Sequence, residues 1–216
     1  MKKIIAIAIT AICLASASFA LDLEFGGRAI LGSNLDPESS LRDSAITIKD
    51  SDTFDFGFGA YGNFALFGGL GIQAEANYIK SSITFLGDKK DGTTEEMPYE
   101  LHTLDISPMV WLNLDLWKFT IGFGAGPNFS IVVPDLQTAA HSSKTDFVTG
   151  LIAGADFKFY ITDHLGLVLS GRYIMEWQKS NYVLEAYGQS VDTNVPIYDP
   201  TRKTLYGGLG IEYKLF

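Results

Sequence analysis

The chain has 216 residues, 47% of them apolar, and its 25 acidic and 16 basic side chains give a formal net charge of −9. A single Cys and an ordinary Gly and Pro content exclude a disulfide scaffold, a collagen and a disordered tail. The acidic balance argues against a nucleic-acid partner, because phosphate contacts need a basic face. Only 19% of residues are charged, below the roughly 25% of soluble domains, yet no stretch after the first twenty residues has the roughly 18 apolar residues of a spanning helix.

Residues 1–20 have the organisation of a secretory signal. Lys2 and Lys3 form a positive start, an apolar run follows, and Ser18 and Ala20 place small residues at the −3 and −1 positions of a cleavage site. We expect cleavage after Ala20, which divides the chain into a signal peptide over 1–20 and one exported domain over 21–216. The only Cys lies within the signal, so the mature chain would stabilise itself without disulfides.

Apolar and polar side chains alternate along most of the mature chain, and a period of two predicts β-strands. In the clearest case Phe56 and Phe58 fall on one face, whereas Asp55, Gly57 and Gly59 fall on the other. The pattern predicts eight strands, which in chain order are Leu23–Leu31, Phe54–Leu66, Leu70–Lys80, Tyr99–Leu112, Trp117–Ile131, Phe147–Phe159, Leu165–Trp177 and Leu205–Leu215.

The connections between these strands alternate in length. Three are tight turns, at Phe67–Gly69, Asn113–Leu116 and Ile161–His164. Four are long and polar, at Asn34–Asp52, Leu86–Pro98, Pro134–Ser143 and about Leu184–Pro200. In an up-and-down meander, all long loops then lie at one end and all short turns and both termini at the other. The fold class predicted is all-β, an eight-stranded antiparallel up-and-down transmembrane β-barrel.

Alternation alone does not say which face is outside, because a soluble lipocalin-like barrel also alternates. An eight-stranded barrel has an interior only just wide enough for side chains, and the apolar face carries more aromatic bulk than that interior accepts. The polar face, rich in Gly and in charges of both signs, therefore fits the lumen, where charges must be paired. The predicted lumen charge network consists of Glu24, Arg28, Asp55, Glu75, Asp105, Lys118, Asp156, Lys158, Arg172, Glu176, Glu212 and Lys214.

Two stretches, Lys118–Phe129 and Gly154–Tyr173, resemble the small eight-stranded outer-membrane barrels of OmpX, OmpA and OmpW type. The resemblance implies an integral protein in the outer membrane of a diderm bacterium, surrounded by outer-membrane lipid. It also implies recognition by the barrel-assembly machinery, for which Tyr213 and Phe216 are the candidate signal at the end of the chain.

No enzymatic or cofactor-binding motif has a fitting context. The string Gly57–Gly62 matches G-x-G-x-x-G, but it lies within a predicted strand and lacks the helix N-terminus that holds a pyrophosphate. His102 and Ser107 have opposite strand parity, so they would face opposite sides of the wall. The three histidines share no metal-ligand spacing. We therefore expect no enzyme, no cofactor and no metal.

The leading hypothesis is a non-enzymatic barrel with a packed polar lumen, whose surface loops stabilise the envelope or contact an extracellular partner. An alternative is an OmpW-like channel for small hydrophobic molecules, and a second is a soluble lipocalin-like ligand-binding barrel. The channel would need an apolar lumen pocket, for which the candidates are Ile30, Met109, Trp111, Val132, Val168 and Ile174.

Overall fold

A computed structural model describes residues 22–35, 46–51, 55–67, 69–88, 93–136, 145–177 and 203–215. In these ranges the chain forms only β-strands, and no helix is long and apolar enough to cross a membrane. The strands are β1 (Asp22–Asn34), β2 (Ile46–Ser51), β3 (Asp55–Phe67), β4 (Leu70–Asp88), β5 (Thr94–Leu116), β6 (Phe119–Leu136), β7 (Asp146–Tyr160), β8 (Leu165–Glu176) and β9 (Lys203–Lys214).

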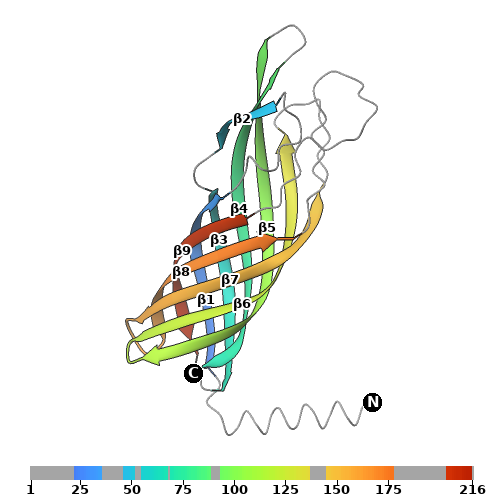
Figure 1. Ribbon diagram of the computed structural model, residues 1–216. Helices are drawn as coiled ribbons and strands as arrows, with labels where there is room; N and C mark the ends of the chain where they lie inside the picture. The colour runs from blue at the N-terminus through green and yellow to red at the C-terminus, as the bar shows by residue number, and fades with distance from the viewer. Residues whose placement is uncertain are drawn as a thin grey trace, which may run out of the picture.

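Eight of the strands close into one antiparallel barrel (Figure 1). The pairing follows chain order from β3 to β9, and β1 completes the ring by pairing with β3 on one side and β9 on the other. Because the barrel is closed, every barrel strand pairs with a neighbour on each side. A sheet in lipid requires this, since no water is present to bind unpaired backbone groups. The predicted eight-stranded up-and-down barrel is confirmed.

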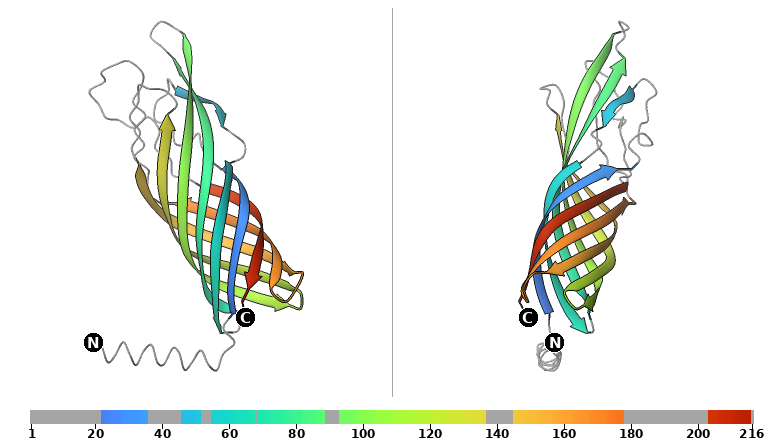
Figure 2. Two further views of the ribbon diagram at one scale, coloured as in Figure 1. Left: turned by 180° about the vertical axis from the view of Figure 1, so that it is seen from behind. Right: turned by 90° about the vertical axis from the view of Figure 1, so that its left-hand side faces the viewer.

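The described short connections, which include Trp117–Lys118 and Ile161–His164, lie together at one end of the barrel, the short-turn end (Figures 1 and 2). The opposite end, beyond which β4 and β5 extend, is the loop-side end. The short-turn end contains the start of β1 and the end of β9. One predicted turn is wrong, because Asn113–Leu116 belongs to β5 and the turn consists of Trp117 and Lys118. Trp117 has a φ of 60°, which a two-residue turn with the twist of a hairpin requires. The apolar side chains change from even to odd residue numbers between Leu116 and Trp117, so the sequence contained a signal for this turn that the prediction overlooked.

The loop-side end contains more strand than the sequence predicted. The predicted loop Leu86–Pro98 is largely strand, because β4 and β5 pair up to Asp88 and Thr94. β6 likewise continues to Leu136. A ninth strand, β2, lies within the predicted loop Asn34–Asp52 and pairs with the upper part of β4. These strands rise above the barrel in Figure 2. The predicted loop Leu184–Pro200, the signal segment 1–20 and Phe216 lie outside the described residues.

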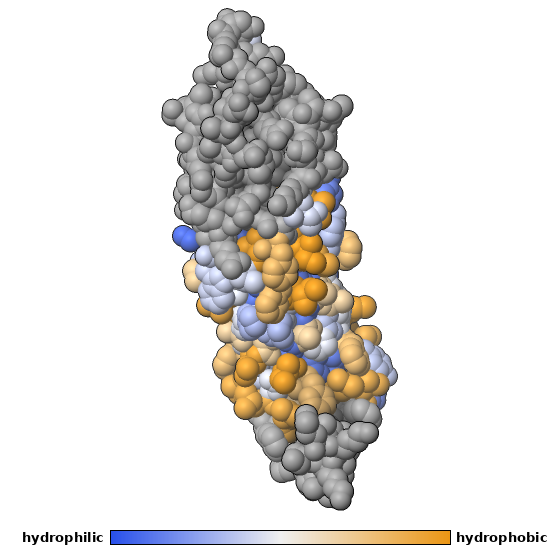
Figure 3. Space-filling model, turned by 90° about the vertical axis from the view of Figure 1, so that its right-hand side faces the viewer, coloured by the Kyte–Doolittle hydropathy of each residue, from blue (hydrophilic) through white to orange (hydrophobic). Residues whose placement is uncertain are grey.

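Inward and outward side chains alternate strictly along the barrel strands, as in the exposed-buried pattern of β8. Aromatic and branched apolar side chains point outward and are largely exposed, among them Phe58 at 61% and Leu209 at 67%. Figure 3 shows apolar side chains over much of the described wall on one face. Such a continuous exposed apolar surface is typical of a wall that faces lipid rather than water.

Candidate functional site in the barrel lumen

Near the short-turn end, one buried ammonium group joins two carboxylates. Lys158 of β7 binds Glu24 of β1, and its Nζ lies 2.8 Å from an Oε atom of Glu212 of β9. The hydroxyl of Tyr160 lies 3.0 Å from Glu24 and 2.6 Å from Glu212. Tyr61 donates a further hydrogen bond to Glu212 at 2.8 Å. Because these groups come from four strands, the cluster ties the walls of the barrel together across the lumen.

A second ionic cluster crosses the middle of the lumen. Glu75 of β4 accepts hydrogen bonds from Arg28 of β1 and from Arg172 of β8, whose Nε lies 2.9 Å from one Glu75 oxygen. The Arg172 Nη1 atom also lies 2.7 Å from Asp156. The Arg172, Glu75 and Asp156 side chains in these pairs are fully buried. Fork-like pairing of guanidinium and carboxylate groups is among the strongest hydrogen bonding that proteins use.

Neutral amides extend each of the two clusters. Asn63 donates to Glu24 at 3.0 Å, and its cross-strand neighbour Gln73 donates to Glu75 at 2.6 Å. On the other wall Asp105 accepts from Ser130 at 2.6 Å. Buried polar side chains therefore line the lumen from one cluster to the next.

The buried lumen carries more acids than bases. In the described residues the buried ionisable side chains are three bases, Arg28, Lys158 and Arg172, and seven acids, Glu24, Asp55, Glu75, Asp105, Asp156, Glu176 and Glu212. Buried charge without compensation costs free energy; Lys158 and Arg172 each pair with two acids, and Arg28 pairs with Glu75. A lumen of this composition opposes the entry of anions.

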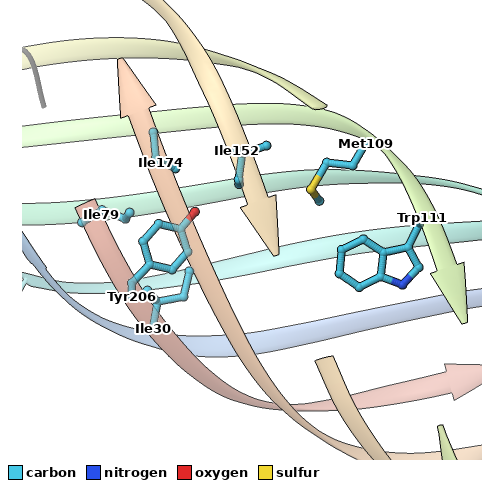
Figure 4. Close-up of a cluster of buried hydrophobic side chains, with 7 residues drawn as sticks. All are labelled: Ile30, Ile79, Met109, Trp111, Ile152, Ile174 and Tyr206. Atoms are coloured by element: carbon cyan, nitrogen blue, oxygen red, sulfur yellow. The ribbon is translucent and has the colours of Figure 1, made fainter. Parts of the chain in front are cut away.

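An apolar cluster fills the remaining interior. It contains Ile30, Ile79, Met109, Trp111, Ile152, Ile174 and Tyr206, each at most 2% exposed. In Figure 4 the isoleucines and Tyr206 gather together, with Met109 and Trp111 further along the lumen. The Arg172 guanidinium lies 5.0 Å from the centre of the Trp111 ring, a cation–π distance. The apolar and ionic clusters are thus in direct contact.

Glycines on the inner face make room for these bulky side chains. A Cβ atom at Gly26 would lie 2.3 Å from the ring of Tyr61, and one at Gly154 would lie 2.6 Å from the Arg172 side chain. Distances below 3.0 Å are not tolerated without movement. Within the G-x-G-x-x-G string, Gly59 has the same basis, because a Cβ at this residue would lie 2.1 Å from the side chain of Asn77.

The short-turn end of the barrel contains a cavity. It has a volume of about 410 Å³ and is lined by turn and rim residues, among them Lys118 and Lys214, and by Tyr160. Tyr160 also belongs to the Lys158 cluster. The cavity therefore reaches as far as the first buried ionic cluster.

The structure places ten of the twelve predicted network residues in the buried lumen. Lys118 is the clear error: it lies in the β5–β6 turn, is exposed, and its Nζ is 5.4 Å from the centre of the Trp117 ring. Lys214 lies at the rim rather than in the interior, where it pairs with Asp22 at 3.0 Å. Lys118 was misplaced because the turn itself was misplaced.

All six predicted apolar lumen residues are buried, but they do not form one group. Val132 and Val168 lie outside the cluster of Figure 4. The prediction missed Ile79, Ile152 and Tyr206, although each has the inward parity of its strand. Strict parity would have identified them.

His102 and Ser107 lie on opposite faces of β5. Ser107 is buried in the lumen, whereas His102 is on the outward face with Tyr78 and Glu100. In the described part of the chain, no group of three or more His, Cys, Asp and Glu side chains could hold a metal ion.

The fold is that of small outer-membrane barrels. The sequence matches no protein-family model and no curated protein. Among solved structures, the outer membrane protein OprG of Pseudomonas aeruginosa is 13% identical, with a TM-score of 0.65 over 90% of this chain and 95% of that one. The attachment invasion locus protein Ail of Yersinia pestis is 9% identical, with a TM-score of 0.53 over 91% of this chain and 100% of that one. The chain is therefore a closed eight-stranded barrel of the outer-membrane type.

Proposed function

We propose that this chain is an integral, non-enzymatic outer-membrane protein whose closed barrel supports a loop-side surface for envelope stabilisation or contact with an extracellular partner. The observation that best supports this proposal is that two ionic clusters and an apolar cluster, all buried, fill the lumen. A filled lumen leaves the outward wall and the loop-side end as the surfaces on which such a protein can act.

The outward wall supports the membrane location. Large apolar side chains on all eight barrel strands are exposed, and in water they would form one contiguous apolar surface far larger than monomers expose. A lipocalin-like soluble barrel would place such side chains inside. We expect the protein to be recovered in the membrane fraction that detergent extracts. Its gel mobility should differ before and after boiling. Recovery in the soluble fraction with unchanged mobility would instead favour the soluble lipocalin-like barrel.

The raised loop-side strands support contact with a partner. Strands β4 and β5 continue beyond the barrel and are joined there by β2. The solved structure of Ail is a complex with the heparin analogue sucrose octasulfate, which is precedent for ligand binding by a barrel of this fold. Deletion of residues 86–96 should reduce binding to partner surfaces without altering heat-modified mobility, whereas the control Lys118→Gln, an exposed change in the short turn at the other end, should alter neither.

The apolar lumen cluster favours one second candidate, passage of small hydrophobic molecules. That function requires the cluster to open, and planar-bilayer conductance together with uptake of a hydrophobic dye into liposomes tests it. A closed scaffold should show neither current nor uptake above empty liposomes. Stable single-channel currents or dye entry would replace the scaffold proposal with the channel.

Two parts of the proposal concern biogenesis. The first is export through a signal cleaved after Ala20, for which the mass of the mature protein should correspond to a start at Leu21. The second is recognition of the end of β9 by the barrel-assembly machinery, supported by the outward, half-exposed ring of Tyr213. Tyr213→Ala should slow assembly more than Leu205→Ala, an outward change at the other end of the same strand.

A further inference from the structure

The cavity at the short-turn end lies between two tight turns that are tied to each other. The Tyr160 amide donates to the Lys118 carbonyl at 2.9 Å, which links the end of β7 to the β5–β6 turn. In the β7–β8 turn, the Thr162 side-chain oxygen accepts hydrogen bonds from the amides of His164 and Leu165, at 3.3 and 2.9 Å. The walls of the cavity are therefore held in place by the chain itself, which lowers the cost of ordering them around a ligand.

Both turns present apolar surface to this cavity. Trp117 lines it from the β5–β6 turn, and Ile161 lines it from the β7–β8 turn. The φ of 60° at Trp117 is rare for a bulky residue. A Gly would adopt it without strain, so the turn geometry does not account for a Trp here. Nor does burial, because the side chain is 88% exposed.

Three charged side chains of the cavity lining have no ion-pair partner within the described residues. Lys118 lies over the Trp117 ring, with its Nζ 5.4 Å from the ring centre, and this contact leaves its charge without an acid. Asp163 has neither an ion pair nor a hydrogen bond in the same part of the chain. Asp115 accepts a hydrogen bond from the neutral Thr120 hydroxyl at 2.5 Å. One ammonium group and two carboxylates therefore face the cavity without opposite charges.

The surroundings of the cavity do not supply these opposite charges. Lys214, the other base of the lining, already pairs with Asp22 at 3.0 Å. In the ionic cluster behind the cavity, Lys158 is shared by Glu24 and Glu212, so the adjoining lumen is also acidic by one charge. The volume of about 410 Å³ lies within the range of roughly 300–1,000 Å³ that small-molecule sites have.

We infer that the short-turn cavity binds a basic amino acid, a small ligand that carries two ammonium groups and one carboxylate. Lys118 pairs with the carboxylate, Asp115 and Asp163 pair with the two ammonium groups, and the carbon chain lies along Trp117 and Ile161. A diamine would leave Lys118 unpaired, and a simple carboxylic acid would leave both aspartates unpaired. The site lies at the opposite end from the loop-side surface, so it goes beyond the partner contact proposed above and is independent of it.

Chemical-shift titration of the folded barrel in detergent micelles tests this site with two ligands. One is L-lysine, and the other is cadaverine, the diamine that lacks its carboxylate. Asp163→Asn should weaken the binding of both ligands about threefold, the effect of a partly exposed ion pair. Lys118→Gln should weaken the binding of L-lysine about threefold and tighten the binding of cadaverine, because a contact with the carboxylate is lost in one case and a repelling cation in the other.

This opposite response separates a specific site from general attraction. L-lysine has a net positive charge, so an acidic surface without a carboxylate contact would bind it more tightly after Lys118→Gln, and that result would overturn the inference. Absence of any shift of the turn resonances with L-lysine would overturn it too. L-lysine amide, which lacks the free carboxylate as a lysine within a peptide does, should respond to Lys118→Gln as cadaverine does. A response like that of L-lysine would show that Lys118 does not bind the carboxylate.

Lys203→Gln is the matched control, because it removes an exposed cation at the loop-side end of β9. It should leave the affinities for L-lysine and cadaverine unchanged, and losses equal to those of Lys118→Gln would contradict a local contact. Heat-modified gel mobility identifies any variant that fails to fold, in which case Lys118→Met or Asp163→Ser takes its place.

Discussion

The two faces of the barrel wall are built from the same strands yet have opposite composition. On β8 the outward Leu167 and Leu169 are 44% and 59% exposed, whereas the inward Arg172 and Ile174 are almost completely buried. A soluble barrel would bury the leucines and expose the arginine. In this molecule, therefore, polarity alone does not decide which side chains are buried. The inward side chains fill a narrow lumen, which accepts charged groups only where other side chains can pair with them.

The inner face predicts the largest mutational effect. Glu75→Met would leave Arg28 and Arg172 buried without their shared carboxylate, and removing one partner of a buried ion pair costs about 3–5 kcal/mol. The free energy of unfolding, measured by urea titration in lipid bilayers, should fall accordingly. Asp22→Asn removes the acid of the partly exposed pair with Lys214 and should cost at most about 1 kcal/mol. Equal losses in the two variants would show that burial does not distinguish these pairs.

The outer face predicts the next largest effect. Leu209 lies midway along β9, points outward and is two-thirds exposed. Leu209→Arg would place a charge within the acyl region, which costs about 2–4 kcal/mol at the bilayer midplane. Leu116→Arg, next to the β5–β6 turn, is the control, because the cost falls to about 0–1 kcal/mol near an interface. If both variants fold in bilayers equally well, the wall does not face lipid.

A third change probes how tightly the inner face is packed. Gly26→Ala directs a methyl group into the ring of Tyr61, and overpacking of this kind costs about 1–3 kcal/mol. A Cβ at the outward Gly171 would meet nothing within 4 Å, so Gly171→Ala should leave the unfolding free energy nearly unchanged. If Gly26→Ala leaves the unfolding free energy unchanged, the Tyr61 ring has space to move.

Period-two alternation was sufficient to predict the closed barrel, the lumen face and most of its charges. It failed at Lys118, because the turn was predicted at Asn113–Leu116, whereas the alternation continues through Leu116 and changes phase only at Trp117, in a turn that contains neither Gly nor Pro. It also failed to predict the strand beyond Leu86, where polar residues continue the β4–β5 ladder above the apolar belt. The pairing of Glu75 with Arg28 and Arg172 was not predictable, because it depends on the register of strands far apart in the sequence.

The smallest expected effect distinguishes packing from gating within the lumen. Ile174→Val removes one methylene from the apolar cluster, and such a change costs about 0.5–1.5 kcal/mol where the site is well packed. Met175→Leu, the outward neighbour on the same strand, keeps the side-chain volume and should change stability less. If the cluster only fills space, the Ile174 variant loses stability and its conductance stays at that of empty bilayers. If conductance rises while stability is unchanged, the cluster is a gate, and the channel function would replace the closed scaffold.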